Sequence, residues 1–403
     1  MVDLKQVEIS KENARRFLVQ RQNLLKEESG KDGTLSAVTR LECVQTDPIN
    51  VVHRNHHLVL HNRIRSYSPS CLEELLYKDR KLFEYWCNEK SIIPFSDLRY
   101  FRYRMQNTSQ FQSPYYDRVK ARRKELKKPI AQVLSEIEKH GPLSSQELEQ
   151  GGAIKGKLET NILNLLWDCG ELMIHHVEGN RRYYDLTVHI VPSVTDIEVP
   201  SREEYEQFMI RKYMWAYGLV DTRDWRFGWL PMKALQRKAI VKKMVESGTL
   251  CPVKVEGVRQ EYYVLRELLN SLEDPRTSID EKVFFIAPLD NLLWNRKVIS
   301  EIFDFDYSWE VYKVPEKRIY GYYVMPILHG TKFVGRIDPK LDRQNQSMII
   351  NSLSLINREA GGGLMNELVA TLRRFLSFHS VSSLTVMRTQ PKELKSALTR
   401  ELS

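Results

Sequence analysis

The chain contains an internal repeat, and no other feature restricts its fold as strongly. Gly170 and Gly248 each end a predicted amphipathic helix, which is the usual place for a helix-terminating glycine. Gly179 and Gly257 each follow a Val-Glu pair and precede an arginine and two adjacent tyrosines. Both glycine pairs are 78 residues apart. This spacing is too long for a solenoid repeat and suits a small domain, so the sequence predicts two copies of one module.

Each copy shows the same order of predicted elements. A helix comes first, then a short helix or turn, then a longer helix, and finally two β-runs around a glycine turn. In the first copy, Gly179-Asn180 separates residues 175–177 from 183–185, which is a signal for a hairpin with a type II′ turn. Three helices followed by a hairpin is the winged-helix order. We therefore expect segments 127–192 and 201–268 to superpose.

The flanking regions differ from this module. Residues 1–125 are predicted to be mostly helical and to form a third winged-helix-like unit. Short β-rich runs at 283–286, 307–312, 321–328 and 331–337 predict a small antiparallel β-barrel or sheet, followed by a helix at 364–378 and a strand at 383–387. The fold class is therefore α+β, with tandem winged helices before the barrel. The expected domains are 1–126, helical or winged-helix; 127–200 and 201–280, winged helices; and 281–403, a β-barrel with a C-terminal helix.

Charge and composition restrict the class of protein without identifying it. Lys and Arg total 61 against 52 Asp and Glu, and this net charge of +9 suits a polyanion such as DNA but is shared by many proteins. No stretch of about 20 apolar residues is present, and the N-terminal region lacks the apolar core of a signal peptide. The five cysteines form no Cys-x-x-Cys pair. We expect a cytoplasmic protein with reduced thiols and no membrane association, located at the nucleoid if the cell is prokaryotic.

The signatures of common enzymes are missing, and one polar cluster remains. The sequence holds no GxSxG, P-loop or HExxH motif and no GxGxxG after a strand. Residues 45–58 are dense in polar groups. Asp47 followed by Pro48 is the pattern of a helix N-cap with proline in the first turn, which is one interpretation of this carboxylate. His53 and His57 could share a helix face. Because no third ligand lies nearby, we expect core or hydrogen-bonded histidines, and neither a metal nor a cofactor.

Several blocks of sequence together resemble one enzyme family. Val44-Gln45-Thr46-Asp47, followed by residues 51–58, is similar to the AlkZ/YcaQ-type winged-helix DNA glycosylases. The combination is specific, whereas each block alone is weak, and the blocks span about residues 35–340 in order. The further matching blocks are 82–86, 287–294, 318–323 with 329–330, and 335–338.

The resemblance implies a fold, a reaction and an active-site motif. The fold is a set of tandem winged helices around a concave DNA-binding channel, followed by a small barrel. The reaction is hydrolysis of the N-glycosidic bond of N7-alkylated purines in double-stranded DNA, together with the unhooking of interstrand crosslinks. The motif is Gln, a middle residue, then Gln or Asp. Gln45-Thr46-Asp47 is its Gln/Asp version, which resembles the YcaQ branch, and Thr46 departs from the usual apolar middle residue.

The chemistry of this reaction suits the two ends of the motif. An N7-alkylguanine is cationic, so it leaves as a neutral base with little help from an acid. The enzyme needs a carboxylate beside C1′ that stabilises oxocarbenium charge and deprotonates water, and Asp47 is the expected group. Gln45 is expected to orient that water through its amide. A bulky crosslink cannot enter a tight pocket, so an open channel is expected.

We expect basic and imidazole side chains to contact DNA. We also expect the protein to act as a monomer. Lys155 and Lys157 lie off the apolar stripe of their helix, where they either contact DNA or only keep the surface soluble. The basic run 97–128 is likewise either a solvated linker helix or a surface that follows phosphates. The full set of expected contacts is Arg54, His56, His57, Lys155, Lys157, Arg181 and Arg182.

Two other functions stay open at this point. A winged-helix transcriptional regulator without enzymatic activity explains the repeated module and the basic charge, but neither the polar cluster nor the barrel. A scaffold protein that does not bind DNA is the third possibility, and it explains fewer of these sequence features than the regulator does. An assay of lesion excision separates the enzyme from the regulator, and binding to unmodified DNA at two salt concentrations separates both from the scaffold.

Overall fold

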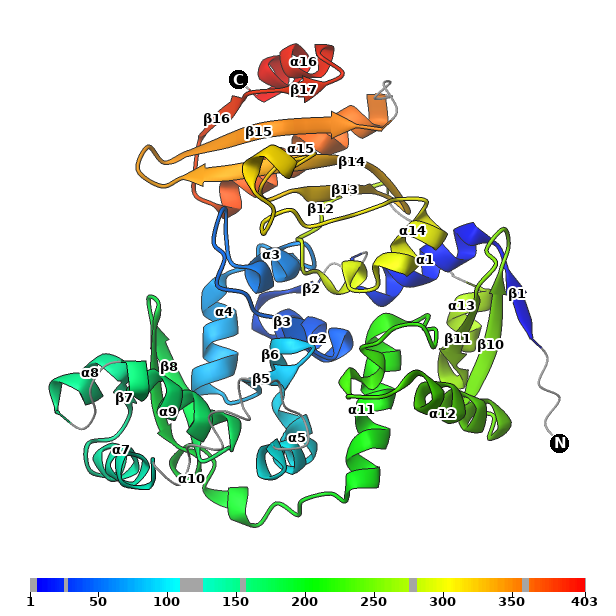
Figure 1. The fold of residues 1–403 in the computed structure, drawn as a ribbon. Coiled ribbons are helices and arrows are strands. Elements are labelled where there is room, and N and C mark those ends of the chain that lie inside the picture. Colours follow the sequence, from blue (N-terminus) through cyan, green and yellow to red (C-terminus); the bar gives the residue numbers. More distant parts are fainter. Residues whose placement is uncertain are drawn as a thin grey trace.

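A computed structural model describes residues 6–24, 28–108, 126–152, 157–274, 281–356 and 362–402, without the side chains of 157–160 and 362. Helices and sheets alternate along the chain, which confirms the predicted α+β class. Three helical units, each with a small sheet, lie below one larger C-terminal sheet in the view of Figure 1.

The N-terminal unit contains the polar cluster of residues 45–58. Its elements are α2 (Gly30–Leu41), β3 (Val44–Gln45), α3 (Asn55–His61), α4 (Pro69–Glu73) with a π-helical turn (Glu74–Lys78), β5 (Leu82–Cys87) and β6 (Glu89–Pro94). The sheet order is β3-β6-β5. The prediction of a mostly helical region misses the β5–β6 hairpin, because its turn contains no glycine and Glu89 itself adopts a φ of 59°.

The second unit has the element order that the repeat predicts. It consists of α7 (Lys127–His140), β7 (Leu143–Ser144), α8 (Ser145–Gln150), α9 (Lys157–Asp168), β8 (Leu172–Glu178) and β9 (Arg181–Leu186). The sheet order is β7-β9-β8. Gly179 has a φ of 60° between the two hairpin strands, a backbone conformation in which glycine is favoured.

The third unit follows the same scheme with a turn in place of the second helix. It consists of α11 (Arg202–Tyr217), a 3₁₀ turn (Phe227–Trp229), α12 (Ala234–Glu246), β10 (Leu250–Val255) and β11 (Glu261–Leu265). Gly257 has a φ of 71° in the hairpin turn. A bridge between Val220 and Tyr263 corresponds to the pairing of Leu143 with Tyr184 in the second unit. In each unit, a segment after the first helix thus pairs with the second hairpin strand.

The remaining helices and strands before the C-terminal part lie between or beside these units. They are β1 (Val7–Ile9), α1 (Lys11–Arg21), β2 (Glu28–Ser29), β4 (Ile64–Arg65), α5 (Leu98–Gln106), α10 (Thr187–Ile190) and α13 (Leu269–Glu273). Strand β1 joins the third unit, where Val7 pairs in parallel with Val253 of β10. Strands β2 and β4 form a two-stranded parallel sheet. The start of the chain therefore lies against its middle.

The C-terminal part is one curled sheet with helices. It consists of β12 (Val283–Phe285), α14 (Arg296–Phe303), β13 (Met325–His329), β14 (Lys332–Asp342), β15 (Ser347–Leu355), α15 (Gly362–Phe378), β16 (Ser383–Val386), β17 (Thr389–Gln390) and α16 (Glu393–Leu402). Strands β12, β13 and β14 are antiparallel, as predicted, and β15, which was not predicted from the sequence, continues the antiparallel pairing. Strands β16 and β17 instead pair in parallel with β15. Within the described residues the sheet is open between β12 and β16, so it is a half-barrel rather than a closed barrel.

One predicted strand of this region is wrong. Residues 307–312 form a loop, although their aromatic pattern indicates a β-run. The side chain of Glu310 in this loop is only 1% exposed and accepts hydrogen bonds from the backbone of residues 319–321. The loop is thus fixed by a buried carboxylate instead of by a neighbouring strand.

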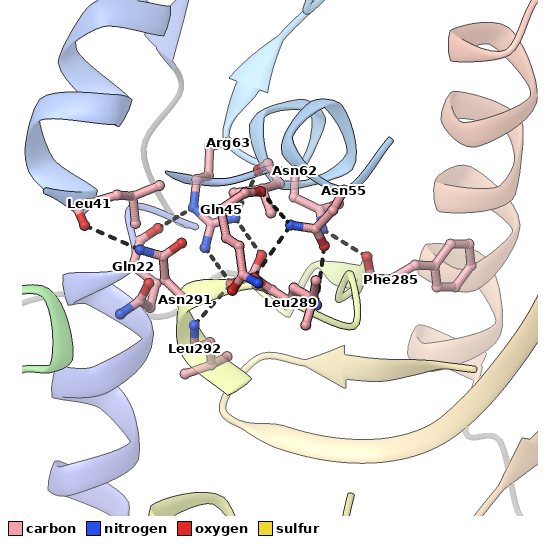
Figure 2. A network of polar contacts seen from close by, with 12 residues as sticks. Gln22, Leu41, Gln45, Asn55, Asn62, Arg63, Phe285, Leu289, Asn291 and Leu292 are labelled. Carbon is pink, nitrogen blue, oxygen red and sulfur yellow. Dashed lines mark hydrogen bonds and ion pairs between the residues drawn. The ribbon is translucent and has the colours of Figure 1, made fainter. Parts of the chain in front are cut away.

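A buried ion pair joins the N-terminal unit to the C-terminal part (Figure 2). Nη1 and Nη2 of Arg63 each lie 2.8 Å from a carboxylate oxygen of Asp290, and neither side chain is exposed. Arg63 also donates to the carbonyl oxygens of Gln22 and Val59, and Asp290 accepts from the backbone of Leu292. Each charge is therefore compensated both by its partner and by further hydrogen bonds, as burial of an ion pair requires.

Five histidines gather where α3 packs against α15, and they are called the histidine cluster below. They are His53, His56, His57, His61 and His379. The ring of His61 stacks on that of Phe378 at 4.3 Å between centroids, and His53 stacks on the same ring at 5.2 Å. Burial lowers the pKa of His53 and His379 to about 4, and that of His56 and His61 to about 3. Burial lowers the pKa of His57 further, so the cluster is neutral at pH 7. His57 is a core histidine, as expected from the sequence.

Replacing Asp290 with Asn should destabilise the protein strongly. The substitution keeps the size of the side chain but leaves the buried guanidinium of Arg63 without a counter-charge, which costs about 3–5 kcal/mol of unfolding free energy. Asp304→Asn is the matched control, because Asp304 is 61% exposed in its pairs with Lys11 and Arg15, and exposed pairs contribute less than about 1 kcal/mol. Urea unfolding measures both, and equal losses would contradict the role of burial.

Stability should fall as the pH drops from about 6.5 to about 4. The folded protein holds the histidine cluster neutral, whereas the unfolded chain takes up protons below the ordinary histidine pKa of 6.5. Each histidine contributes up to about 1.4 kcal/mol per pH unit in this window. His61→Phe keeps a ring on Phe378 and should flatten the dependence. Thermal unfolding at several pH values measures this, and a variant as acid-sensitive as the wild type would exclude His61 as a source.

Candidate active site

The motif Gln45-Thr46-Asp47 lies at the end of the edge strand β3. Gln45 is paired with Ser91 of β6. Both the backbone N–H and the hydroxyl of Thr46 donate to the carbonyl oxygen of Lys90, at 2.8 and 3.1 Å. The polar middle residue is thus explained, because its hydroxyl binds the neighbouring strand. Residues two apart on an extended segment share a face, so the spacing of Gln45 and Asp47 favours one side for both, with Asp47 just beyond the end of β3.

The carboxylate of Asp47 stands in a turn, so its interpretation as a helix N-cap is wrong. Its Oδ1 accepts a hydrogen bond from the backbone of Ile49 at 2.8 Å, whereas the next helix, α3, begins only at Asn55. In a turn, as at a helix N-cap, an aspartate accepts a backbone N–H bond with a carboxylate oxygen. The Asp-Pro pattern therefore does not distinguish a turn from the start of a helix. The side chain is half-buried. Burial raises the pKa of Asp47, and the bond from Ile49 opposes this rise.

Two asparagines position the motif, and the sequence reasoning missed both. Nδ2 of Asn55 donates to the backbone oxygen of Gln45 at 3.0 Å (Figure 2). Nδ2 of Asn88, in the turn between β5 and β6, lies 3.5 Å from Oε1 of Gln45, a long hydrogen bond. In this arrangement the amide nitrogen of Gln45 remains as the donor that can act on a ligand. The role of these two asparagines cannot be predicted from the neighbouring sequence, because the residues that they bind lie far away along the chain.

The block at 287–294 holds the motif in place from the C-terminal side. The amide of Asn55 exchanges hydrogen bonds with the backbone N–H and carbonyl of Leu289, at 3.1 and 3.4 Å. Nδ2 of Asn291 donates to the carbonyl oxygens of Leu41 and Cys43, just before the motif. This block therefore binds the backbone just before Gln45 directly, through Asn291, and reaches the carbonyl of Gln45 indirectly, through Asn55 (Figure 2).

The two histidines expected to contact DNA are buried. His56 and His57 are each 8% exposed, and Nδ1 of His57 is hydrogen-bonded to the hydroxyl of Tyr67 at 2.8 Å. Both therefore belong to the core rather than to the surface. Arg54 instead donates to Oδ1 of Asn180, in the turn of the β8–β9 hairpin. This contact brings the hairpin of the second unit beside the segment that follows the motif.

The two arginines of that hairpin differ in their surroundings. Arg181 is exposed, with the hydroxyl of Tyr183 at 3.5 Å. Arg182 donates to Glu84 of β5 at 2.8 Å, and the carboxylate of Glu84 also accepts from Tyr77. Arg182 thus fastens the second unit to the first, a long-range pairing that the sequence did not indicate. Lys155 lies outside the described residues, and only the backbone of Lys157, the first residue of α9, is described.

The charge of Asp47 affects a buried tyrosine. Tyr323 is 1% exposed, and its backbone N–H donates to Asp338 at 2.9 Å. Burial raises the pKa of Tyr323, and the charges of Tyr307 and Asp47 raise it further. Within the described ranges, no group of three His, Cys, Asp or Glu side chains is placed to hold a metal ion.

Comparison with known proteins gives two findings. The family model "DNA glycosylase AlkZ-like" matches residues 38–378. The fold is similar to that of the DNA glycosylase AlkZ of Streptomyces sahachiroi, with a TM-score of 0.65 and 18% sequence identity over 95% of this chain and 100% of that chain. In the described part of the chain, no helix is long and apolar enough to cross a membrane. The match over most of the sequence confirms the resemblance carried by the motifs, and the chain belongs to the AlkZ-like DNA glycosylase family.

Proposed function

We propose that this protein hydrolyses the N-glycosidic bond of N7-alkylated purines in double-stranded DNA and unhooks interstrand crosslinks. The observation that carries the proposal is the geometry of the motif. Gln45 at the end of β3 and Asp47 two residues later are both partly exposed, on a backbone held by Asn55 and Asn291. A firmly held carboxylate and amide at an accessible edge suit a reaction on a large substrate.

The chemistry follows from the charge of the leaving base. Because an N7-alkylpurine is already cationic, its departure leaves positive charge on the sugar, and Asp47 is the carboxylate that stabilises this charge. Partial burial of Asp47 strengthens the interaction, since the effective dielectric constant is lower there than in water. The same carboxylate takes the proton of the attacking water, and the amide of Gln45 orients that water. No other acid is needed to release the neutral base.

The hairpins and third helices of the units supply the DNA-binding surface in this proposal. Lys157 at the start of α9, Lys155 two residues before it in the sequence, and Arg181 in the β8–β9 hairpin are the proposed phosphate contacts. The contact of Arg54 with Asn180 supports this arrangement, because it places the hairpin tip beside the segment that contains Asp47. In our proposal the three units act as winged helices and a single copy of the chain binds the damaged duplex.

Replacing Asp47 with Asn should abolish most of the activity without affecting the fold. Asn keeps the acceptor for Ile49, so the melting temperature and the affinity for DNA should be unchanged. Release of N7-methylguanine should be at least about a hundredfold slower, the low end for loss of a general base. Gln45→Ala should cost less, since water can partly replace an amide. Asp196→Asn, at an exposed carboxylate outside the site, is the control. Wild-type release by Asp47→Asn would reject the assignment.

The rate should also depend on pH through Asp47. Only the ionised carboxylate can accept a proton, and burial raises its pKa above the ordinary value of 3.8. The rate of release under single-turnover conditions should therefore decrease on the acidic side at a higher pH than an exposed aspartate would give. This acid limb should be absent from the residual rate of Asp47→Asn. The rate is compared over the range in which the wild type stays folded.

Arg181 and Arg182 should respond differently to substitution by alanine. Arg181→Ala should weaken DNA binding equally for all sequences and reduce the slope of log K against log salt by about 0.9, as expected for one lost phosphate contact. Arg182→Ala should lower the melting temperature, because it leaves the carboxylate of Glu84, whose side chain is only 10% exposed, without its counter-charge. Titrations at several salt concentrations and thermal unfolding separate the two effects. A sequence-selective loss for Arg181→Ala would favour a regulator.

A further inference from the structure

Exposed apolar side chains gather in one short segment. Of the ten large apolar side chains that remain exposed in the described part of the chain, five lie between residues 312 and 322, here called the tyrosine loop. They are Tyr312, Val314, Ile319, Tyr320 and Tyr322. Single exposed apolar residues are common, whereas a contiguous group on a soluble protein indicates an interaction site.

The tyrosine loop is held rigidly by a buried carboxylate. Oε2 of Glu310 accepts hydrogen bonds from the backbone N–H groups of Ile319, Tyr320 and Gly321, at 2.9, 2.8 and 3.3 Å. Oε1 of Glu310 pairs with Lys313 at 2.9 Å. Burial alone would raise the pKa of Glu310, but these donors lower it to about 2, so the anchor stays charged at every physiological pH. The loop therefore keeps one shape although its apolar side chains face solvent.

A second carboxylate fixes the other side of the loop. Asp338 accepts from the backbone of Tyr322 and Tyr323, at 3.3 and 2.9 Å. Gly321 has a φ of 144°, and a Cβ at this position would lie 2.2 Å from Oδ2 of Asp338. Only glycine allows so close an approach, and it lies between the two exposed tyrosines. The geometry thus presents Tyr320 and Tyr322 outward from a backbone held on both sides.

Each of these two rings carries a guanidinium on one face. The Cζ atom of Arg336 is 4.1 Å from the centre of the Tyr320 ring, and that of Arg318 is 4.8 Å from the centre of the Tyr322 ring. The rings themselves are 41% and 38% exposed. Flat apolar surfaces with positive charge beside them match the two parts of a nucleic acid, because bases stack on aromatic rings and phosphates attract arginines.

The position of the tyrosine loop connects it to the site. The backbone of Tyr322 and Tyr323 is bound to Asp338, which lies in β14. The same strand touches the segment after the motif, where the backbone N–H of Leu341 donates to the carbonyl of Val51 at 3.2 Å. The tyrosine loop and the segment that carries the motif are therefore both fastened to β14.

We propose that Tyr320 and Tyr322 contact the DNA at the lesion by stacking on bases that have lost their neighbours there. This inference rests on the proposed function, since its occupant is damaged DNA. A crosslinked base cannot be withdrawn into a pocket, so the duplex must be opened around it to expose C1′ to Asp47. A rigid aromatic surface replaces the stacking that this opening removes.

The test uses DNA binding rather than base release. The probe is a duplex with a stable tetrahydrofuran abasic analogue opposite 2-aminopurine, whose fluorescence reports stacking. Tyr320→Ala and Tyr322→Ala should each weaken binding roughly 5- to 100-fold, the range that base–aromatic stacking supplies, and remove the fluorescence change caused by the wild type. Tyr320→Phe and Tyr322→Phe should restore both, because stacking needs the ring and not the hydroxyl. Met387→Ala, at an exposed apolar residue of another segment, is the control.

Three outcomes would overturn the inference. Alanine variants that bind and change the fluorescence like the wild type would show that the rings do not touch DNA. Phenylalanine variants as weak as the alanine variants would assign the effect to the hydroxyls. Alanine variants that alter only self-association in sedimentation would make the loop a contact between copies of the chain. None of these readouts requires excision, so a wild type that binds the probe but releases no N7-methylguanine would defeat the proposed function alone.

Discussion

The arrangement of the site depends on the buried pair of Arg63 and Asp290. Removing two charges from water is unfavourable unless each finds a full set of partners, and this requirement fixes the relative position of α3 and the loop after β12. The carbonyls of Gln22 and Val59 complete the hydrogen bonds of the guanidinium, so three distant segments must meet at one point. Once they have met, the neighbouring asparagines reach the backbone of β3.

The residues that hold the backbone of the motif are different from those proposed to act on the substrate. The clamps on the motif act on backbone atoms: Asn55 binds the carbonyl of Gln45, and Asn291 binds that of Cys43. The side chains of Gln45 and Asp47 make one bond each, with Asn88 and with the backbone of Ile49, and both are partly exposed, so each can still meet a ligand. Thr46 completes the separation, because its hydroxyl binds the backbone of Lys90 instead of pointing at the site.

The sequence predicted features that depend on local spacing and missed those that depend on distant partners. The repeated glycines predicted the element order of the second and third units. They mark helix ends and hairpin turns, because the backbone at these positions adopts a positive φ that glycine favours. The β5–β6 hairpin was not predicted, because the residue with a positive φ in its turn is Glu89 and not a glycine. The motif could be found by its resemblance to a known family. The pairing of Arg182 with Glu84 and the burial of His56 depend on packing between distant parts of the chain, so no local sequence pattern predicts them.

The parallel pairing of β1 with β10 has a consequence for the order in which the chain can fold. Val7 pairs with Val253, and α1 bonds through Lys11 and Arg15 to Asp304 after α14. During synthesis β1 and α1 leave the ribosome more than 200 residues before these partners exist. They can take their final position only when the third unit and α14 have emerged, after the first two units have been made. Native contacts of β1 and α1 thus form late although these elements are made early relative to their partners.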